Sequence, residues 1–347
     1  QYSEENIENL TLSKEEIIDY VRSTNFNTKT ILATDYENFK KYLKKDTYPL
    51  HIDYLNNDCA PDLLRFIKSS MSNKNNSYYT FLQKIGEQSL PVFNKEQIKM
   101  IDNLSELLPL VRVDEYIIVN QLLNNGLNID ELINYNSKVT KDTLNHALKH
   151  LKQFNIINDN NELIIQTGDV FIDFINDLIS YGLERYDIEF GDYEDNFKLY
   201  GNYYSEQIQM CLLKGFKAFI HGTQFLDNDV FCYVNLKKDS LIDSGINYKD
   251  KFLTSSLFQW ESGKNTTFTT GDGPKLLATK KVHLFVRKIK EEDGIVLPFT
   301  YFGTGKFVNP RESFTTENDV KHNTLLFDIE LDNVVPEEYW FDFNISK

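Results

Sequence analysis

The chain has 347 residues, 41% of them hydrophobic and 14% aromatic, which is enough for two or three domains with packed cores. Its net charge of −15 excludes a uniformly basic nucleic-acid binder. The three cysteines are far apart and form no CxxC pair, which excludes a zinc framework and predicts a reducing, cytoplasmic setting. No apolar run approaches the roughly 20 residues of a membrane span, so we expect no membrane partner. Because the chain starts at Gln1, we expect it to be a fragment of a longer polypeptide.

Residues 1–110 read as a helical region. Tyr78–Ile85 has the apolar spacing of a helix, and Pro49 and Pro61 interrupt the pattern around it. No catalytic spacing occurs here. We therefore predict a helical connector that couples neighbouring domains.

Residues 111–199 predict a winged-helix-like domain with a linker helix. Tyr116–Leu123 is a helical segment, and Thr140 can cap a later helix, before two short apolar runs that flank the polar turn 158–161. The apolar face of that later helix carries Leu144, Ala147, Leu148 and Leu151. Its polar residues are Lys141, His146, Lys149, His150 and Lys152. This helix either enters a DNA groove or acts as a protein–protein spacer.

A helix over Val170–Leu183 and an acidic connector, Asp187–Asp195, precede a β-rich part, residues 200–347. Residues 200–316 carry a net charge of +3, whereas residues 317–347 carry −6. A local +3 fits a DNA-binding surface but also an ordinary one. Leu253–Trp260 alternates and places Phe258, Trp260 and Ser262 on one side of a strand, opposite Leu257, Gln259 and Glu261.

Motifs for catalysis are absent from the sequence. It contains no phosphate-binding loop, no HxK nuclease signature, no HExxH and no GxSxG. We therefore expect no catalytic residue, no metal ligand and no cofactor in this fragment, and the β-rich part to bind its target rather than cut it.

An ordered set of segments gives a more specific indication. It consists of Tyr204–Ile208, Phe231–Lys238, Phe258–Ser262, Val282–Arg287 and Phe299–Gly303. This set resembles the C-terminal region of modification-dependent (type IV) restriction endonucleases that carry an upstream phospholipase-D-type nuclease and a DEAD/DEAH-type helicase. The resemblance covers about residues 200–345 well and the helical part more loosely.

The resemblance implies a C-terminal SRA/PUA-like β-barrel for DNA recognition, which with the helical region and the winged-helix-like middle predicts an α+β fold in three parts. The partners would be double-stranded DNA with 5-methylcytosine or 5-hydroxymethylcytosine and the upstream nuclease and helicase domains, of which the helicase uses ATP and Mg²⁺. Flipping the modified base into a pocket lets a protein test the whole ring.

Such a pocket needs aromatic faces, a carboxylate or amide, and small residues. The pocket candidates are Tyr248, Asp250, Ser255, Phe258, Gln259, Trp260, Glu261 and Ser262. The candidates for phosphate contacts are Lys237, Lys238, Lys264, Lys280, Lys281, Lys306 and Arg311. Phe258 and Trp260 fit a barrel core as well as a stacking platform, and Asp250 fits a turn cap.

Three functions remain open at this point. The first is target recognition by base flipping in a modification-dependent restriction enzyme. The second is a regulatory or protein-interaction scaffold of a helicase–nuclease. The third is single-strand binding behind the motor, with exposed aromatic rings as the stacking surface.

Overall fold

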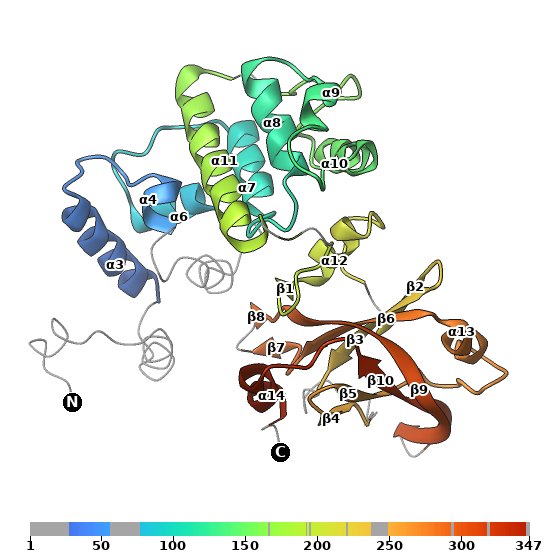
Figure 1. Cartoon of the computed structure of the whole chain (residues 1–347). Helices are drawn as coiled ribbons and strands as arrows, with labels where there is room; N and C mark the ends of the chain where they lie inside the picture. The colour runs from blue at the N-terminus through green and yellow to red at the C-terminus, as the bar shows by residue number, and fades with distance from the viewer. Residues whose placement is uncertain are drawn as a thin grey trace, which may run out of the picture. The chain divides into compact units, whose positions relative to one another are not determined.

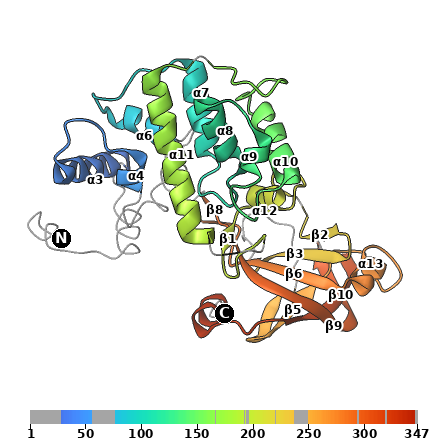
Figure 2. The ribbon, with the colours of Figure 1, turned by 45° about the horizontal axis from the view of Figure 1, so that its top comes forward.

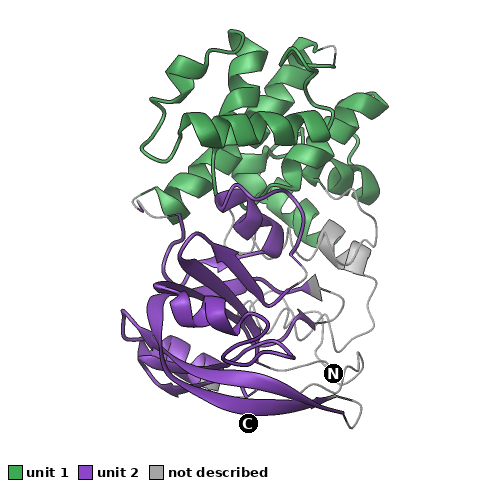
Figure 3. Ribbon diagram, turned by 90° about the vertical axis from the view of Figure 1, so that its right-hand side faces the viewer, with its two compact units in different colours: residues 1–192 green, residues 193–347 purple. Residues whose placement is uncertain are grey.

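The structure, a computed structural model, describes residues 28–55, 77–165, 167–191, 193, 196–219, 221–236, 249–292, 295–317 and 320–344. The chain divides into two compact units, residues 1–192 and residues 193–347 (Figure 3). The boundary falls within the acidic connector predicted at Asp187–Asp195. Among the described helices, none combines the length and apolarity that crossing a bilayer requires.

Unit 1 is helical. Its described helices are α3 (Thr28–Leu43), α4 (His51–Leu55), α6 (Tyr78–Ile85), α7 (Lys95–Ser105), α8 (Asp114–Asn124), α9 (Ile129–Leu132), α10 (Lys141–Gln153) and α11 (Asp169–Phe190). The long helix α11 packs against α4, α7 and α8 (Figures 1 and 2). A Cβ on Gly182 of α11 would lie 2.4 Å from the Tyr116 ring, so glycine permits the close approach of α11 to α8. Through α11, the regions predicted as 1–110 and 111–199 pack together in one unit.

The helix ends of unit 1 follow their local sequence. Ser77 caps α6 through a hydrogen bond from the Thr80 amide, and Gly86 ends that helix at a φ of 85°. The predicted cap Thr140 forms a capping box with Thr143 at the start of α10. Both predicted helices are therefore confirmed.

The winged-helix prediction is not confirmed in its details. Helices α8, α9 and α10 precede a polar turn as expected, but one antiparallel bridge, Ile157 with Leu163, stands where the two-stranded ribbon was predicted. The apolar face of α10 is confirmed, since Leu144, Ala147 and Leu151 are each 0% exposed.

Unit 2 is built on a sheet. Its elements are β1 (Asn202–Tyr203), α12 (Ser205–Cys211), β2 (Thr223–Leu226), β3 (Asp229–Asn235), β4 (Lys251–Thr254), β5 (Leu257–Glu261), α13 (Gly273–Ala278), β6 (Lys281–Arg287), β7 (Glu291–Glu292), β8 (Ile295–Val296), β9 (Phe299–Glu317), β10 (Val320–Leu331) and α14 (Glu337–Asn344). Eight strands form one mostly antiparallel sheet in the order β2-β3-β6-β9-β10-β5-β4, with β1 beside β9. The molecule is thus α+β, as predicted.

The predicted closed barrel is not confirmed. Strands β2 and β4 end the sheet path, and among the described strands they do not pair with each other. The parallel pairing of β3 with β6 requires a long crossover, which contains β4 and β5. These two strands then join the sheet through β10 rather than beside β3.

One side of this sheet forms the hydrophobic core of unit 2. It gathers Val230 and Cys232 of β3, Val282 of β6, and Phe327 and Ile329 of β10. Strands β9 and β10 are long and run side by side as a ribbon (Figure 1). Because side chains alternate along a strand, the same strands present a second row of residues on the opposite side.

Candidate nucleic-acid interface

Strand β5 divides the predicted pocket residues between the two sides of the sheet. Phe258 and Trp260 lie opposite Ile329 and Phe327 of β10, on the core side. Gln259 lies opposite Asp328, on the other side. The alternation predicted for this strand is therefore confirmed, and it separates the aromatic candidates from the amide.

Of the two alternatives left open for Phe258 and Trp260, core or stacking platform, the structure places both residues in the core. Phe258 is 0% exposed and Trp260 is 3% exposed. The Trp260 ring is stacked on Phe307 with centroids 5.3 Å apart, and the Phe258 ring meets Phe252 edge-on at 4.8 Å. Because other side chains of the protein already pack against both rings, neither ring can stack on a flipped base. Tyr248 lies outside the described residues.

The Glu261 carboxylate is buried and satisfied by hydrogen bonds. Its Oε1 accepts from the Thr324 hydroxyl at 2.6 Å and the Ser313 hydroxyl at 3.1 Å, and its Oε2 accepts from the Lys249 amide at 2.8 Å. The neighbouring Asp250 carboxylate accepts from the Glu261 amide at 2.8 Å. These carboxylates therefore hold β4, β5, β9 and β10 together, which contradicts the role predicted for Glu261 as a base-reading group.

The two serines of the predicted pocket also serve the fold. Ser262 is 1% exposed, and its hydroxyl accepts from the Leu325 amide at 2.8 Å. The Ser255 carbonyl accepts from the Val335 amide at 2.7 Å, and the side chain of Ser255 is half-buried.

The opposite side of β5, β9 and β10 carries four hydrogen-bonding side chains, which we call the polar face: Gln259, Asn309, Arg311 and Asp328. The Arg311 Nη2 donates to Gln259 Oε1 and to Asp328 Oδ1, each at 2.9 Å. Asn309 Nδ2 donates to Asp328 Oδ2 at 3.1 Å. The strand register explains why these side chains lie together. Asp328 lies opposite Gln259 on β5, and Arg311 lies opposite Leu326, which is two residues before Asp328 on β10.

Solvent reaches the polar face unevenly. The Arg311 side chain is 38% exposed, whereas that of Asp328 is 9% exposed. The buried carboxylate orients the guanidinium, whose Nη1 also donates to the Asn309 carbonyl at 2.9 Å. Gln259 Nε2 donates to the Lys249 carbonyl at 2.7 Å, so the side chains of the polar face are held in place by hydrogen bonds within unit 2.

Of the other predicted phosphate contacts, two meet near this face. Val282 of β6 lies opposite Gly305 of β9, so the antiparallel register places the exposed Lys281 beside Lys306. Lys306 forms an exposed ion pair with Glu330 at 3.0 Å. Lys280 is exposed next to Lys281, and Lys264 is half-buried in the loop after β5. Lys237 and Lys238 lie outside the described residues.

Beyond Arg311 the ribbon continues as an arm, residues 312–317 of β9 and 320–324 of β10. In strand pairing, β5 ends at Glu261 opposite Leu326, and the loop after β5 reaches the arm through a hydrogen bond from the Thr266 amide to the Asn323 carbonyl at 3.2 Å. Phe314 is 47% exposed on this arm. The Nζ atoms of Lys249 and Lys321 lie 5.0 Å and 3.8 Å from its ring centroid.

Sequence reasoning identified Gln259 and Arg311 and missed Asn309, Phe314, Lys249 and Lys321. By the β9–β10 register, Phe314 lies opposite Asn323, on the same side of the ribbon as the core residue Leu325, so alternation alone would have placed it with the core residues. That register follows from long-range pairing, for which the local sequence contains no signal.

In unit 1, His150 of α10 is buried and His146 is half-buried. Glu115 of α8 accepts from the Arg112 guanidinium and lies 2.9 Å from His150 Nδ1, and Arg112 lies 3.0 Å from His146 Nδ1. Burial lowers the pKa of His146 to about 4. Burial alone would raise the pKa of Glu115, but Arg112 and His150 lower it to about 2. His150 is therefore part of a buried contact of α10, while Lys141 and Lys149 are exposed.

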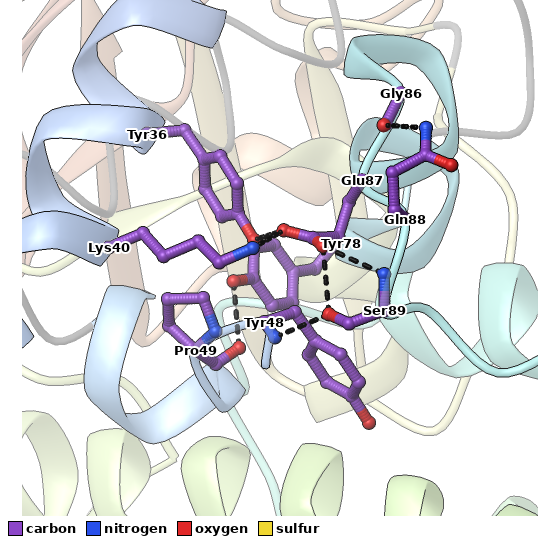
Figure 4. A network of polar contacts seen from close by, with 9 residues as sticks. All are labelled: Tyr36, Lys40, Tyr48, Pro49, Tyr78, Gly86, Glu87, Gln88 and Ser89. Atoms are coloured by element: carbon purple, nitrogen blue, oxygen red, sulfur yellow. Dashed lines mark hydrogen bonds and ion pairs between the residues drawn. The ribbon is translucent and has the colours of Figure 1, made fainter. Parts of the chain in front are cut away.

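A second carboxylate network in unit 1 joins α3 to the segment after α6 (Figure 4). Glu87 accepts from Lys40 Nζ at 2.6 Å, from the Tyr36 hydroxyl and from the Ser89 amide at 2.9 Å. Burial would raise the pKa of Glu87, but these donors lower it to about 2. The carboxylate oxygens of Glu87 already accept these hydrogen bonds. The network therefore stabilises the packing of the helices, and Glu87 is not available as a general base. Among the residues that the structure describes, no three His, Cys, Asp or Glu side chains gather to hold a metal ion.

Comparison with known proteins gives one family match in each unit. Residues 32–163 match the family model described as "Domain of unknown function (DUF8090)", and residues 197–343 match "Domain of unknown function (DUF3427)". No curated protein matches the chain. Among solved structures, the chain is similar to the DNA recognition domain of the cytosine modification-dependent restriction endonuclease LpnPI, with 11% identity and a TM-score of 0.25. That match covers 37% of this chain and 71% of that chain, and assigns no role to any residue of the polar face.

Proposed function

We propose that unit 2 recognises double-stranded DNA and that the polar face reads base edges. The observation that carries this proposal is the hydrogen-bonded set of Gln259, Asn309 and Arg311 around the buried Asp328. Arginine pairs with two acceptors of guanine, and asparagine or glutamine with the two polar groups of adenine, in the major groove. Two-stranded ribbons are among the elements that fit this groove.

The fixed position of the Arg311 guanidinium supports a role of the polar face in DNA recognition. A guanidinium held by a carboxylate loses less side-chain freedom on binding than a solvated one. The strands that carry the face are fixed from behind by the core aromatic residues Phe258, Trp260 and Phe327. The face therefore meets a ligand without refolding.

Lys281 and Lys306 would supply phosphate contacts beside the face. Phosphate contacts position a protein on the duplex and make binding salt-dependent, whereas base contacts give specificity. Because Lys306 is already paired with Glu330, a phosphate would have to exchange with that carboxylate.

We further propose that the recognised duplex carries 5-methylcytosine or 5-hydroxymethylcytosine, extruded from the stack, and that the chain is the target-recognition part of a modification-dependent restriction enzyme. The ordered segments from Tyr204–Ile208 to Phe299–Gly303 support this proposal. In that enzyme the upstream helicase would use ATP and Mg²⁺, while this part binds and does not cut. With Phe258 and Trp260 in the core, the base would be read outside the predicted pocket.

Binding of the whole chain to labelled duplexes of one sequence tests the proposal. The duplexes are unmodified, methylated or hydroxymethylated, and each is measured by fluorescence anisotropy at two stated salt concentrations. We expect tighter binding of a modified duplex by wild type and its loss in Arg311→Ala. Lys288→Ala is the matched control, because Lys288 is a half-exposed cation of unit 2 that pairs with Asp342 away from the polar face.

Three results would contradict the proposal. Equal affinity for all duplexes would remove modified cytosine as the target. A preference for single strands would select stacking behind a motor, and no binding to any nucleic acid would favour an interaction scaffold.

A further inference from the structure

We propose that Phe314, at the ribbon arm, is the wedge that enters the base stack of the recognised duplex, with Lys249 and Lys321 on the neighbouring phosphates. This inference rests on the proposed function of unit 2 and adds a residue that fills the space left by an extruded base.

The exposure of the Phe314 ring indicates a ligand rather than a role in the fold. The ring is 47% exposed, whereas the aromatic residues of β5, Phe258 and Trp260, are buried. It lies on an arm that extends past the last residue of β5. About half of the ring is covered and the rest is accessible to a ligand.

Two cations lie beside the same ring. The Lys321 ammonium is 3.8 Å from the ring centroid, and the Lys249 ammonium is 5.0 Å from it. Lys249 is held by the Ser313 hydroxyl at 2.8 Å and the Phe314 carbonyl at 3.3 Å. Two like charges around one apolar group repel each other in the free protein, and an anionic ligand relieves that repulsion.

Duplex DNA combines the two features that this arrangement complements. Its base steps accept apolar wedges such as phenylalanine, and its phosphates lie on both sides of each step. Removing a base from the stack leaves a gap whose neighbours have lost stacking, and a ring of this size restores part of it. The acid nearest the ring in β9 is the exposed Glu312, two residues before Phe314. Its charge opposes phosphate, so it limits affinity without blocking the ring.

The test compares Phe314→Ala with Phe314→Leu in the whole chain. A duplex with 2-aminopurine next to the modified cytosine reports unstacking as a rise in fluorescence, and anisotropy reports affinity. We expect Phe314→Ala to lose the fluorescence rise and about tenfold in affinity for the modified duplex. Phe314→Leu, which keeps an apolar wedge, should retain most of both. Thermal unfolding should be unchanged in both variants, since the ring is exposed.

The outcomes distinguish failure of the wedge role proposed for Phe314 from failure of the DNA recognition proposed for unit 2. If Phe314→Ala keeps the full fluorescence rise and affinity while Arg311→Ala loses binding, the wedge is wrong and DNA recognition stands. If wild type binds no duplex, both are wrong. Phenylalanine-dependent binding to vesicles of anionic lipid, without binding to DNA, would also overturn both and make the arm a membrane contact.

Discussion

An arginine and a carboxylate meet in each unit, and the two pairs differ in how far water reaches them. In unit 1, the side chains of Arg112 and Glu115 are 9% and 2% exposed. In unit 2, those of Arg311 and Asp328 are 38% and 9% exposed. The two pairs therefore have different roles. The pair in unit 1 stabilises a buried contact between α8 and α10, whereas the pair in unit 2 orients a guanidinium at the surface.

The comparison also applies to the aromatic residues of unit 2. Trp260 fills the core behind the sheet, and Phe314 extends from the ribbon. Residue type left Trp260 open as a core or a ligand-binding ring, and its burial places it in the core, whereas Phe314 is accessible. In both comparisons, the buried group stabilises the fold and the more exposed group is accessible for recognition.

Removing Glu115 should have the largest effect. Glu115→Gln leaves Arg112 buried without its carboxylate, and breaking a buried pair costs about 3–5 kcal/mol. Urea unfolding should show this loss. A loss below about 1 kcal/mol would contradict the view that the buried pair is structural.

Truncating Trp260 should also destabilise the protein by about 3–5 kcal/mol, because the change opens a cavity against Phe307 and Phe327. The urea transition of unit 2 measures this loss. Full stability together with lost DNA discrimination would instead restore Trp260 as a stacking residue.

Exchanging Arg311 for lysine should spare the fold and change recognition. Arg311→Lys keeps the charge but loses the planar donors, so we expect about 10- to 100-fold weaker binding of the preferred duplex with a similar salt dependence. Anisotropy across a salt series measures both quantities. Unchanged affinity would assign Arg311 to phosphate contact alone.

The pH dependence of unit 1 should change in Asp114→Asn. Burial raises the pKa of Asp114 to about 6 from its usual 3.8. A carboxyl with a raised folded-state pKa contributes stability when protonated and loses it as the pH rises between about 4 and 6. The variant lacks this loss and should be more stable than wild type at pH 7, by about 1–2 kcal/mol. The advantage should shrink below pH 4, and urea unfolding at both pH values checks it.

The smallest effect should come from Glu312. Glu312→Gln removes a negative charge from the arm beside Phe314, so duplex binding should strengthen by about two- to threefold at low salt and less at high salt. Anisotropy at two salt concentrations is sufficient. Weaker binding would place Glu312 in contact with the ligand.

Local sequence predicted the elements better than the site. The α6 helix, the Thr140 cap and the alternation in β5 depend on residues within a few positions, and each is confirmed. The partners of Glu261, Ser313 and Thr324, are 52 and 63 residues away from it. The β9–β10 register brings these partners to Glu261, and it cannot be read from the local sequence. The sequence therefore suggested that Glu261 reads a base, whereas in the structure its carboxylate accepts hydrogen bonds from the protein itself. The open sheet was missed for the same reason.

The central claim is that the polar face discriminates modified from unmodified duplex DNA. Its most direct test is the ratio of the two dissociation constants, measured for wild type and Arg311→Lys at the same salt concentration. We expect a ratio well above one for wild type and near one for the variant. A ratio of one for wild type, or the same ratio in both proteins, would contradict the claim.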